Sequence, residues 1–172
     1  RSAAILVKDD SKSGSSGGAM SEFSDMGIFR SNTNINNELF TLKSPALMTE
    51  VVRRLRLNET YTVRKGLKNV DLYKANPVAV TFGEVMEKPV SFTIRIDSKD
   101  AFTISGLKVA GVESENTFAG RMGDSIQTAA GTLFISPTKF YSDACIGTSI
   151  RYAMGKADGA ADRYLHALRV EL

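Results

Sequence analysis

The sequence predicts a domain of the α+β (α/β) class, in which N- and C-terminal strands form a mixed sheet with packed helices and a less regular β-rich middle section. Two observations carry this prediction: helical apolar patterns occur near both ends of the chain, and several β-rich runs lie between them. The chain has 172 residues, of which 42% are hydrophobic and 24% charged, enough for a core without disulfides or metals. We therefore expect residues 1–172 to form a single domain.

The N-terminal segment is predicted to begin with a strand. Ser2 to Val7 is an apolar run, and the Ser/Gly-rich residues 11–18 that follow it are a flexible loop by composition. Residues 19–29 carry apolar side chains at helical spacing, and so do residues 32–42. This part of the chain should therefore supply one strand and two short helices.

The clearest helix begins at Ser44-Pro45. Serine can cap the free N–H groups of a helix, and proline fits the first turn, where its missing N–H costs nothing. The apolar side chains that follow share one helical stripe: Leu47, Met48, Val51, Val52 and Leu55. The last turn is basic, which suits the negative end of the helix dipole.

From Asn58 onward the pattern changes to β-rich runs. We expect strands at residues 60–63, 77–82, 91–96, 101–104, 132–135 and 149–153. Phe92, Ile94 and Ile96 alternate with polar neighbours, as in a half-buried strand, and residues 97–100 form the turn of a hairpin. Gly111 to Gly131 is rich in glycine and polar residues, which predicts a mobile loop.

The C-terminal segment predicts a helix over residues 156–167 and a closing strand over residues 168–172. Strands at both ends favour a sheet that brings the termini together, as in a domain inserted between two membrane helices. The longest apolar runs are only a few residues, far from the ~20 that cross a bilayer. The chain opens at Arg1, so we interpret it as a fragment whose flanking membrane segments have been removed.

Composition excludes several function classes. The net charge is only +3, too balanced for the concentrated basic stripe of a nucleic-acid-binding domain. Cys145 is the only cysteine and His166 the only histidine, so neither has a second Cys or His with metal-ligand spacing. We expect no metal site, no cofactor and no catalytic residue.

An enzyme is the weakest of three hypotheses. Three carboxylate pairs exist, and all of them fall in predicted turns: Glu84/Glu87, Asp97/Asp100 and Glu113/Glu115. A glycosidase needs two carboxyl groups held face to face, which pairs within turns do not provide. The chain also contains no Trp to stack on a sugar.

The basic helix end is the strongest candidate for a functional surface. Arg53, Arg54 and Arg56 form the densest cationic cluster of the chain. They can simply complement the helix dipole, or they can contact an acidic polymer, a lipid headgroup or a neighbouring subunit. The candidate interaction surface comprises Lys43, Arg53, Arg54 and Arg56.

Residues 25–57 carry a distinctive order of short motifs: Asn37-Glu38, Leu42-Lys43-Ser44 and Met48-Thr49-Glu50-Val51-Val52. The tail adds Ile150-Arg-Tyr152, a helix and Leu168-Arg-Val-Glu-Leu172. This order resembles the periplasmic domain of Wzz-type polysaccharide co-polymerases, the chain-length determinants, and most of all the capsular exopolysaccharide members with a cytoplasmic tyrosine autokinase. The resemblance covers residues 2–82 well and 132–172 moderately, whereas 83–131 is an unassigned β/loop excursion.

The resemblance implies a non-catalytic periplasmic domain of an inner-membrane protein that forms rings of subunits. Such proteins act with a polysaccharide polymerase or export machinery and set the chain length of O-antigen, and thus of lipopolysaccharide, or of capsule or exopolysaccharide. No Walker motif is present, so these residues cannot supply a kinase activity. The alternative is a carbohydrate-binding module that contacts the polymer directly, with Phe118, Phe140 and Tyr141 as candidate aromatics.

Overall fold

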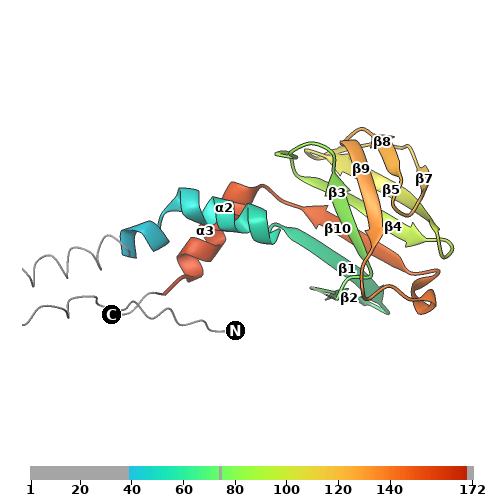
Figure 1. Cartoon of the computed structure of the whole chain (residues 1–172), viewed down its shortest axis with the longest axis horizontal. Coiled ribbons are helices and arrows are strands. Elements are labelled where there is room, and N and C mark those ends of the chain that lie inside the picture. Colours follow the sequence, from blue (N-terminus) through green and yellow to red (C-terminus); the bar gives the residue numbers. More distant parts are fainter. Residues whose placement is uncertain (1–38, 74, 170–172) are drawn as a thin grey trace, which may run out of the picture.

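The computed structural model describes residues 39–73 and 75–169 and consists of two antiparallel β-sheets with a pair of helices beside them (Figure 1). Of the described residues, 42% lie in strands and 22% are helical. The expected α+β class, with a mixed sheet covered by helices, is therefore wrong. Every strand pairing is antiparallel, and the helices stand away from the sheets instead of covering them. The predicted strand at 2–7 and helix at 19–29 lie outside the described residues.

The larger sheet has the strand order β2-β1-β10-β4-β5-β6, and β7 also pairs with β5. Its strands are β1 (Glu59–Lys65), β2 (Lys68–Asp71), β4 (Val90–Ile96), β5 (Ala101–Val109), β6 (Val112–Glu113), β7 (Phe118–Arg121) and β10 (Ser149–Met154). The smaller sheet has the order β3-β9-β8. Its strands are β3 (Val78–Phe82), β8 (Ser125–Thr128) and β9 (Gly131–Pro137), and a short 3-10 helix, η1 (Asp143–Cys145), precedes β10.

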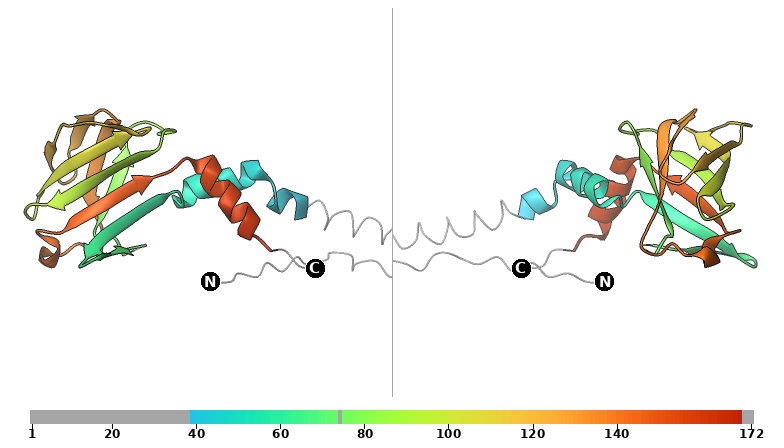
Figure 2. Two further views of the ribbon diagram at one scale, coloured as in Figure 1. Left: turned by 180° about the vertical axis from the view of Figure 1, so that it is seen from behind. Right: turned by 45° about the vertical axis from the view of Figure 1, so that its right-hand side comes forward.

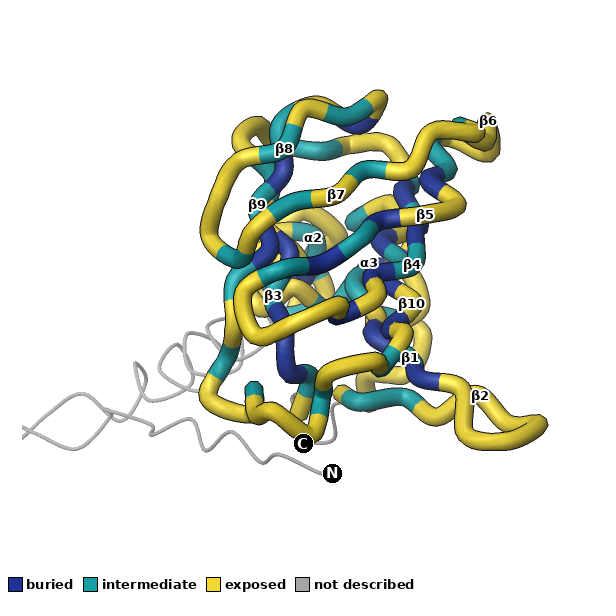
Figure 3. The backbone as a smooth tube through the Cα atoms, turned by 90° about the vertical axis from the view of Figure 1, so that its right-hand side faces the viewer, coloured by how far each residue is buried: buried dark blue, intermediate teal, exposed yellow. Residues whose placement is uncertain are grey.

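The two sheets enclose one apolar core, and together they form what we call the β module. The predicted alternation on β4 is confirmed, because Phe92, Ile94 and Ile96 are all at most 2% exposed. The β4–β5 hairpin is confirmed as well, with Ile94 opposite Ile104. Figure 3 shows the buried segments of several strands lying inside the β module, with exposed turns around them. Hydrophobic burial between the sheets is therefore the main stabilising term.

The segment from Gly111 to Gly131 is not the irregular loop that its composition predicted. It contains β6, β7 and β8, each of two to four residues. Gly120 lies within β7, where a Cβ atom would overlap Ile126 Cδ1 and come within 3.1 Å of Phe102 Cζ. This glycine permits a close approach of two strands and does not mark a loop.

The helix pair consists of α2 (Pro45–Leu55) and α3 (Ala157–Ala167), which pack on each other beside the β module (Figures 1 and 2). Both helices were predicted, with Pro45 in the first turn of α2, although the Ser44 side chain makes no capping hydrogen bond. Residues 39–42 are also helical, whereas Leu168 and Arg169 are not in a strand. The helix pair has a small core of its own, made of Val52, Ala160 and Ala161.

The start of β1 and the end of β10 connect the helix pair to the β module, and we call this two-stranded connection the neck. Helix α2 leads into β1, α3 follows β10, and Glu59 pairs with Met154 where the two strands meet the helices. The Gly155 N–H donates to the Asn58 carbonyl at 2.9 Å, and Asn58 Nδ2 donates to the Gly155 carbonyl at 2.8 Å. The two antiparallel strands therefore place both helices at the same end of the β module.

Side chains close the β module where β3 faces β1, a junction that we call the seam. On the opposite side, the short β7–β8 connection joins the two sheets directly. At the seam, the Val80 N–H donates to the Tyr61 hydroxyl at 3.0 Å, and the Arg56 guanidinium donates to the Val80 carbonyl. The buried edge of β3 thus finds side-chain partners in place of a neighbouring strand.

Two tyrosine variants should separate the contributions of the seam. Tyr61→Phe leaves the buried Val80 N–H unpaired and is expected to lower the free energy of unfolding by about 1–2 kcal/mol. The buried Tyr152 hydroxyl makes no hydrogen bond of normal geometry and interacts only electrostatically with the Glu59 carboxylate, so Tyr152→Phe should change stability by less than about 1 kcal/mol. Urea denaturation of both variants measures the difference, and a larger loss for Tyr152→Phe would contradict it.

Candidate functional site

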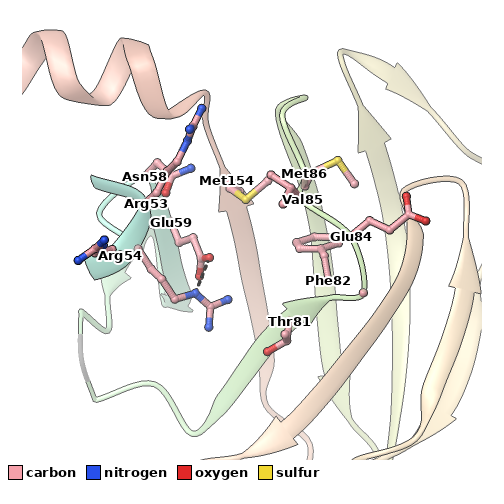
Figure 4. Close-up of a pocket in the computed structure, with 12 residues that line it drawn as sticks. Arg53, Arg54, Asn58, Glu59, Thr81, Phe82, Glu84, Val85, Met86 and Met154 are labelled. Atoms are coloured by element: carbon pink, nitrogen blue, oxygen red, sulfur yellow. Dashed lines mark hydrogen bonds and ion pairs between the residues drawn. The ribbon is translucent and has the colours of Figure 1, made fainter. Parts of the chain in front are cut away.

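An open pocket of about 520 Å³ lies at the upper end of the seam, between the end of α2 and the loop that follows β3 (Figure 4). We call it the seam pocket. Its volume falls within the ~300–1,000 Å³ typical of small-molecule sites. Residues from α2, the start of β1, the end of β3 and the end of β10 line it, so distant parts of the chain build it together.

One wall of the seam pocket is cationic. Arg53, Arg54 and Arg56 come from the last turn of α2 and its C-cap. Arg54 Nε lies 2.7 Å from Glu50 Oε1 in an exposed i,i+4 pair, which contributes little to stability. The Arg53 guanidinium has no ion pair or hydrogen-bond partner among the described residues, so its charge is available to a ligand.

Arg56 joins the helix pair to the seam. Its Nε lies 2.7 Å from Glu59 Oε1, and its guanidinium also reaches the Val80 carbonyl. The chain leaves α2 with Arg56 in the left-handed region at φ 54°, which turns the backbone toward β1. Burial opposes the charge of Arg56, but the hydrogen bond and the charge of Glu59 outweigh it and raise the pKa of the guanidinium.

Glu59 sits at the base of this wall with a side chain that is 9% exposed. Burial raises the pKa of the Glu59 carboxyl, although Arg56 acts in the opposite direction. The Tyr61 hydroxyl lies 3.5 Å from Glu59 Oε2, and the same carboxylate helps to raise the pKa of Tyr152. Arg56, Glu59, Tyr61 and Tyr152 therefore form one electrostatic group beneath the seam pocket.

Tyr61 and Tyr152 predict how the stability of the chain depends on pH in the alkaline range. Burial raises the pKa of Tyr61 to about 12 and raises the pKa of Tyr152 further. Both values lie above the ~10 of a tyrosine in an unfolded chain, so the native state binds more protons and its stability should fall as pH rises above about 10. Absorbance at 295 nm should show two of the five tyrosines ionising only as the circular dichroism is lost. Ionisation of all five below pH 11 with native circular dichroism would contradict the assignment.

The opposite wall of the seam pocket is largely apolar. Phe82 and Met154 face the arginines in Figure 4, whereas Met86 extends away from them and packs against the core, and Val85 is 83% exposed at the rim. Two polar side chains at this wall, Thr81 and Glu84, make no hydrogen bond or ion pair to another described residue. The seam pocket thus combines an apolar wall with free groups of both charges.

The structure brings three of the four predicted interaction residues together. Arg53, Arg54 and Arg56 line the seam pocket, whereas Lys43 is exposed before the start of α2 and does not line it. The sequence did not point to Glu59, Phe82, Val85 or Met86, and it named Glu84 only as one of a carboxylate pair with Glu87. Their role depends on β3 folding back against β1, and no local pattern carries that information.

The carboxylate pairs that the sequence suggested do not come together in one site. Glu84 and Glu87 precede β4, whereas Asp97 and Asp100 lie in the turn after it, at the opposite end of that strand. Asp97 is engaged by Arg95 and Thr103, and the hydrogen bond from Thr103 is the largest cause that lowers its pKa. Within residues 39–73 and 75–169, no group of three or more His, Cys, Asp or Glu side chains can hold a metal ion.

Comparison with protein-family models and with curated proteins finds no match to this chain. In the part of the chain that the structure describes, no helix has the length and hydropathy to cross a membrane.

Proposed function

We propose that this chain is a non-catalytic periplasmic domain of an inner-membrane polysaccharide co-polymerase. In this role it assembles with copies of itself and regulates, together with a polymerase or export machinery, the chain length of a capsular polysaccharide, exopolysaccharide or O-antigen. The parent protein is expected to anchor the domain through membrane helices and, as in the members that the sequence most resembles, to carry a cytoplasmic tyrosine kinase domain.

The observation that supports the proposal best is the exposed apolar stripe of α2. This helix carries part of the motif order on which the family resemblance depends. Val52 faces α3, whereas Leu55 is 62% exposed and Leu47 is 39% exposed. Leu47, Val51 and Leu55 follow one another at intervals of four residues and so share one side of the helix.

Exposed apolar side chains also lie on α3 and just outside the two helices. Phe40 is 74% exposed, and Tyr164 and Leu168 are more than a third exposed. Exposed apolar side chains that share one side of a helix mark protein contacts more often than free surface, and Arg53 and Arg54 lie on the same helix. A neighbouring copy that covers the apolar side of α2 would bury the stripe.

The test uses the membrane-embedded protein in a polysaccharide-producing host that lacks its own chain-length determinant. Wild type should sediment as a multimer in detergent and narrow the polymer length distribution on gels. The double variant Leu47→Asp/Leu55→Asp places two charges in the stripe, so it should break the multimer and broaden the distribution.

Leu67→Asp is the matched control, because Leu67 is 96% exposed on the β1–β2 turn and lies away from α2. It should leave both multimer and polymer length as in wild type. A wild-type protein that is strictly monomeric in its membrane extract, or a polymer distribution that ignores the protein altogether, would refute the proposed function.

A further inference from the structure

We propose that the seam pocket binds an acidic saccharide, with the carboxylate of a uronate residue held by the arginine wall and the sugar ring laid against the apolar wall. The choice of a saccharide rests on the proposed function, whereas the demand for a negative charge and an apolar face comes from the pocket itself. The ligand would be a short stretch of polymer that runs past the neck of the domain.

The arginine wall supplies the anion-binding element. The Arg53 guanidinium has no partner among the described residues, and the Arg54–Glu50 pair is exposed enough to exchange for a ligand. A guanidinium binds a carboxylate through two parallel N–H donors, which favours a planar carboxylate over a neutral hydroxyl. Arg56 is committed to Glu59 and Val80, so it serves as the fixed end of the wall.

The apolar wall supplies a surface for a sugar ring. Phe82 and Met154 offer a face against which the C–H groups of a pyranose can pack, and the exposed Val85 side chain extends this face at the rim. Apolar walls with a few placed polar groups are typical of small-ligand sites.

A sugar hydroxyl also has a free partner at the seam pocket. The Thr81 hydroxyl has no partner among the described residues and can donate or accept a hydrogen bond, whereas the Glu84 carboxylate extends away from the arginine wall in Figure 4. The aromatics that the sequence suggested for sugar binding lie elsewhere. The Tyr141 hydroxyl donates to the Lys99 carbonyl at 2.9 Å, Phe118 packs against the core, and Lys139 lies over the Phe140 ring.

The experiment is calorimetric titration of the whole chain with two ligands that differ only at their carboxyl groups: a trigalacturonate and its uncharged, fully methyl-esterified form. The acid should bind with an affinity that weakens as salt rises, and the ester should give no heat at millimolar concentration. In parallel, amide resonances of residues 82–86 should shift on addition of the acid, a readout that needs no variant.

Arg53→Gln should weaken binding of the acid at least tenfold, and Val85→Ser should weaken it several-fold. Lys43→Gln is the matched control, since Lys43 is an exposed cation of the same chain that does not line the seam pocket. It should bind as wild type does. These substitutions fall on exposed side chains, so the variants should fold.

Several outcomes would overturn the saccharide site. They are equal binding of acid and ester, equal loss in Arg53→Gln and Lys43→Gln, no heat with the acid, or binding of anionic phosphatidylglycerol vesicles but not of trigalacturonate. Such a failure stays distinguishable from failure of the proposed function, because the Leu47→Asp/Leu55→Asp assay reads multimer size and polymer length without reference to the seam pocket. If the domain controls polymer length but does not bind trigalacturonate, the saccharide site is refuted and the proposed function is not.

Discussion

Phe92→Ala is expected to lower the free energy of unfolding by about 3–5 kcal/mol, the largest effect of any single substitution considered for this chain. The Phe92 side chain is 2% exposed, and its ring centroid lies 5.0 Å from that of Tyr152. Removing the ring leaves a cavity between the two sheets that neighbouring side chains fill only in part. Urea denaturation followed by circular dichroism in the far ultraviolet measures the loss.

Phe140→Ala is the matched control, because this ring is 44% exposed and contacts the Lys139 ammonium rather than the core. It should change stability by less than about 1 kcal/mol. If the two variants lost similar stability, the core of the β module would not lie between the sheets as described.

Arg56→Ala is expected to cost about 2 kcal/mol. The substitution removes a charge-assisted hydrogen bond to Glu59 and the donor to the Val80 carbonyl, and it leaves a buried carboxylate without its cation. The figure stays moderate because the Arg56 side chain is 42% exposed and water can replace part of the interaction.

Arg56→Gly provides the internal comparison. It loses the same side chain, but glycine adopts the backbone at φ 54° without the steric cost that alanine meets there. It should therefore be about 1 kcal/mol more stable than Arg56→Ala in the same urea experiment. Equal stabilities of the two variants would show that the left-handed backbone at this position has no energetic cost. If Arg56→Ala were as stable as wild type, Arg56 would not stabilise the seam.

Local patterns predicted the elements that local interactions decide. The proline, the apolar stripe and the basic last turn identified α2, and the alternation of Phe92, Ile94 and Ile96 identified β4 and its hairpin with β5. The fold class was wrong because it depended on where the helices would lie. Helices α2 and α3 bury a small core between themselves, and the two sheets cover each other.

The difference between local and long-range interactions also explains which residues of the seam pocket the sequence could predict. The arginines of α2 stood out because they are adjacent in sequence, and the structure does place them on one wall of the seam pocket. Phe82 and Glu59 could not be paired with them in advance. Their proximity depends on Tyr61 and Arg56 meeting the edge of β3 at Val80, a contact between residues 19 or more positions apart.

The two-stranded neck has a mechanical consequence. Force that pulls both helices together away from the β module runs along β1 and β10 and loads many hydrogen bonds at once, since β1 is also held by β2 and β10 by β4. Force that spreads the helices apart instead loads the β1–β10 ladder from one end, beginning at the Glu59 and Met154 pair, so the bonds break one after another. The neck should therefore resist a force directed along the two strands and give way at a lower force when the helices are pulled apart from each other. The mechanical stability of the domain depends on the direction in which the helix pair is pulled.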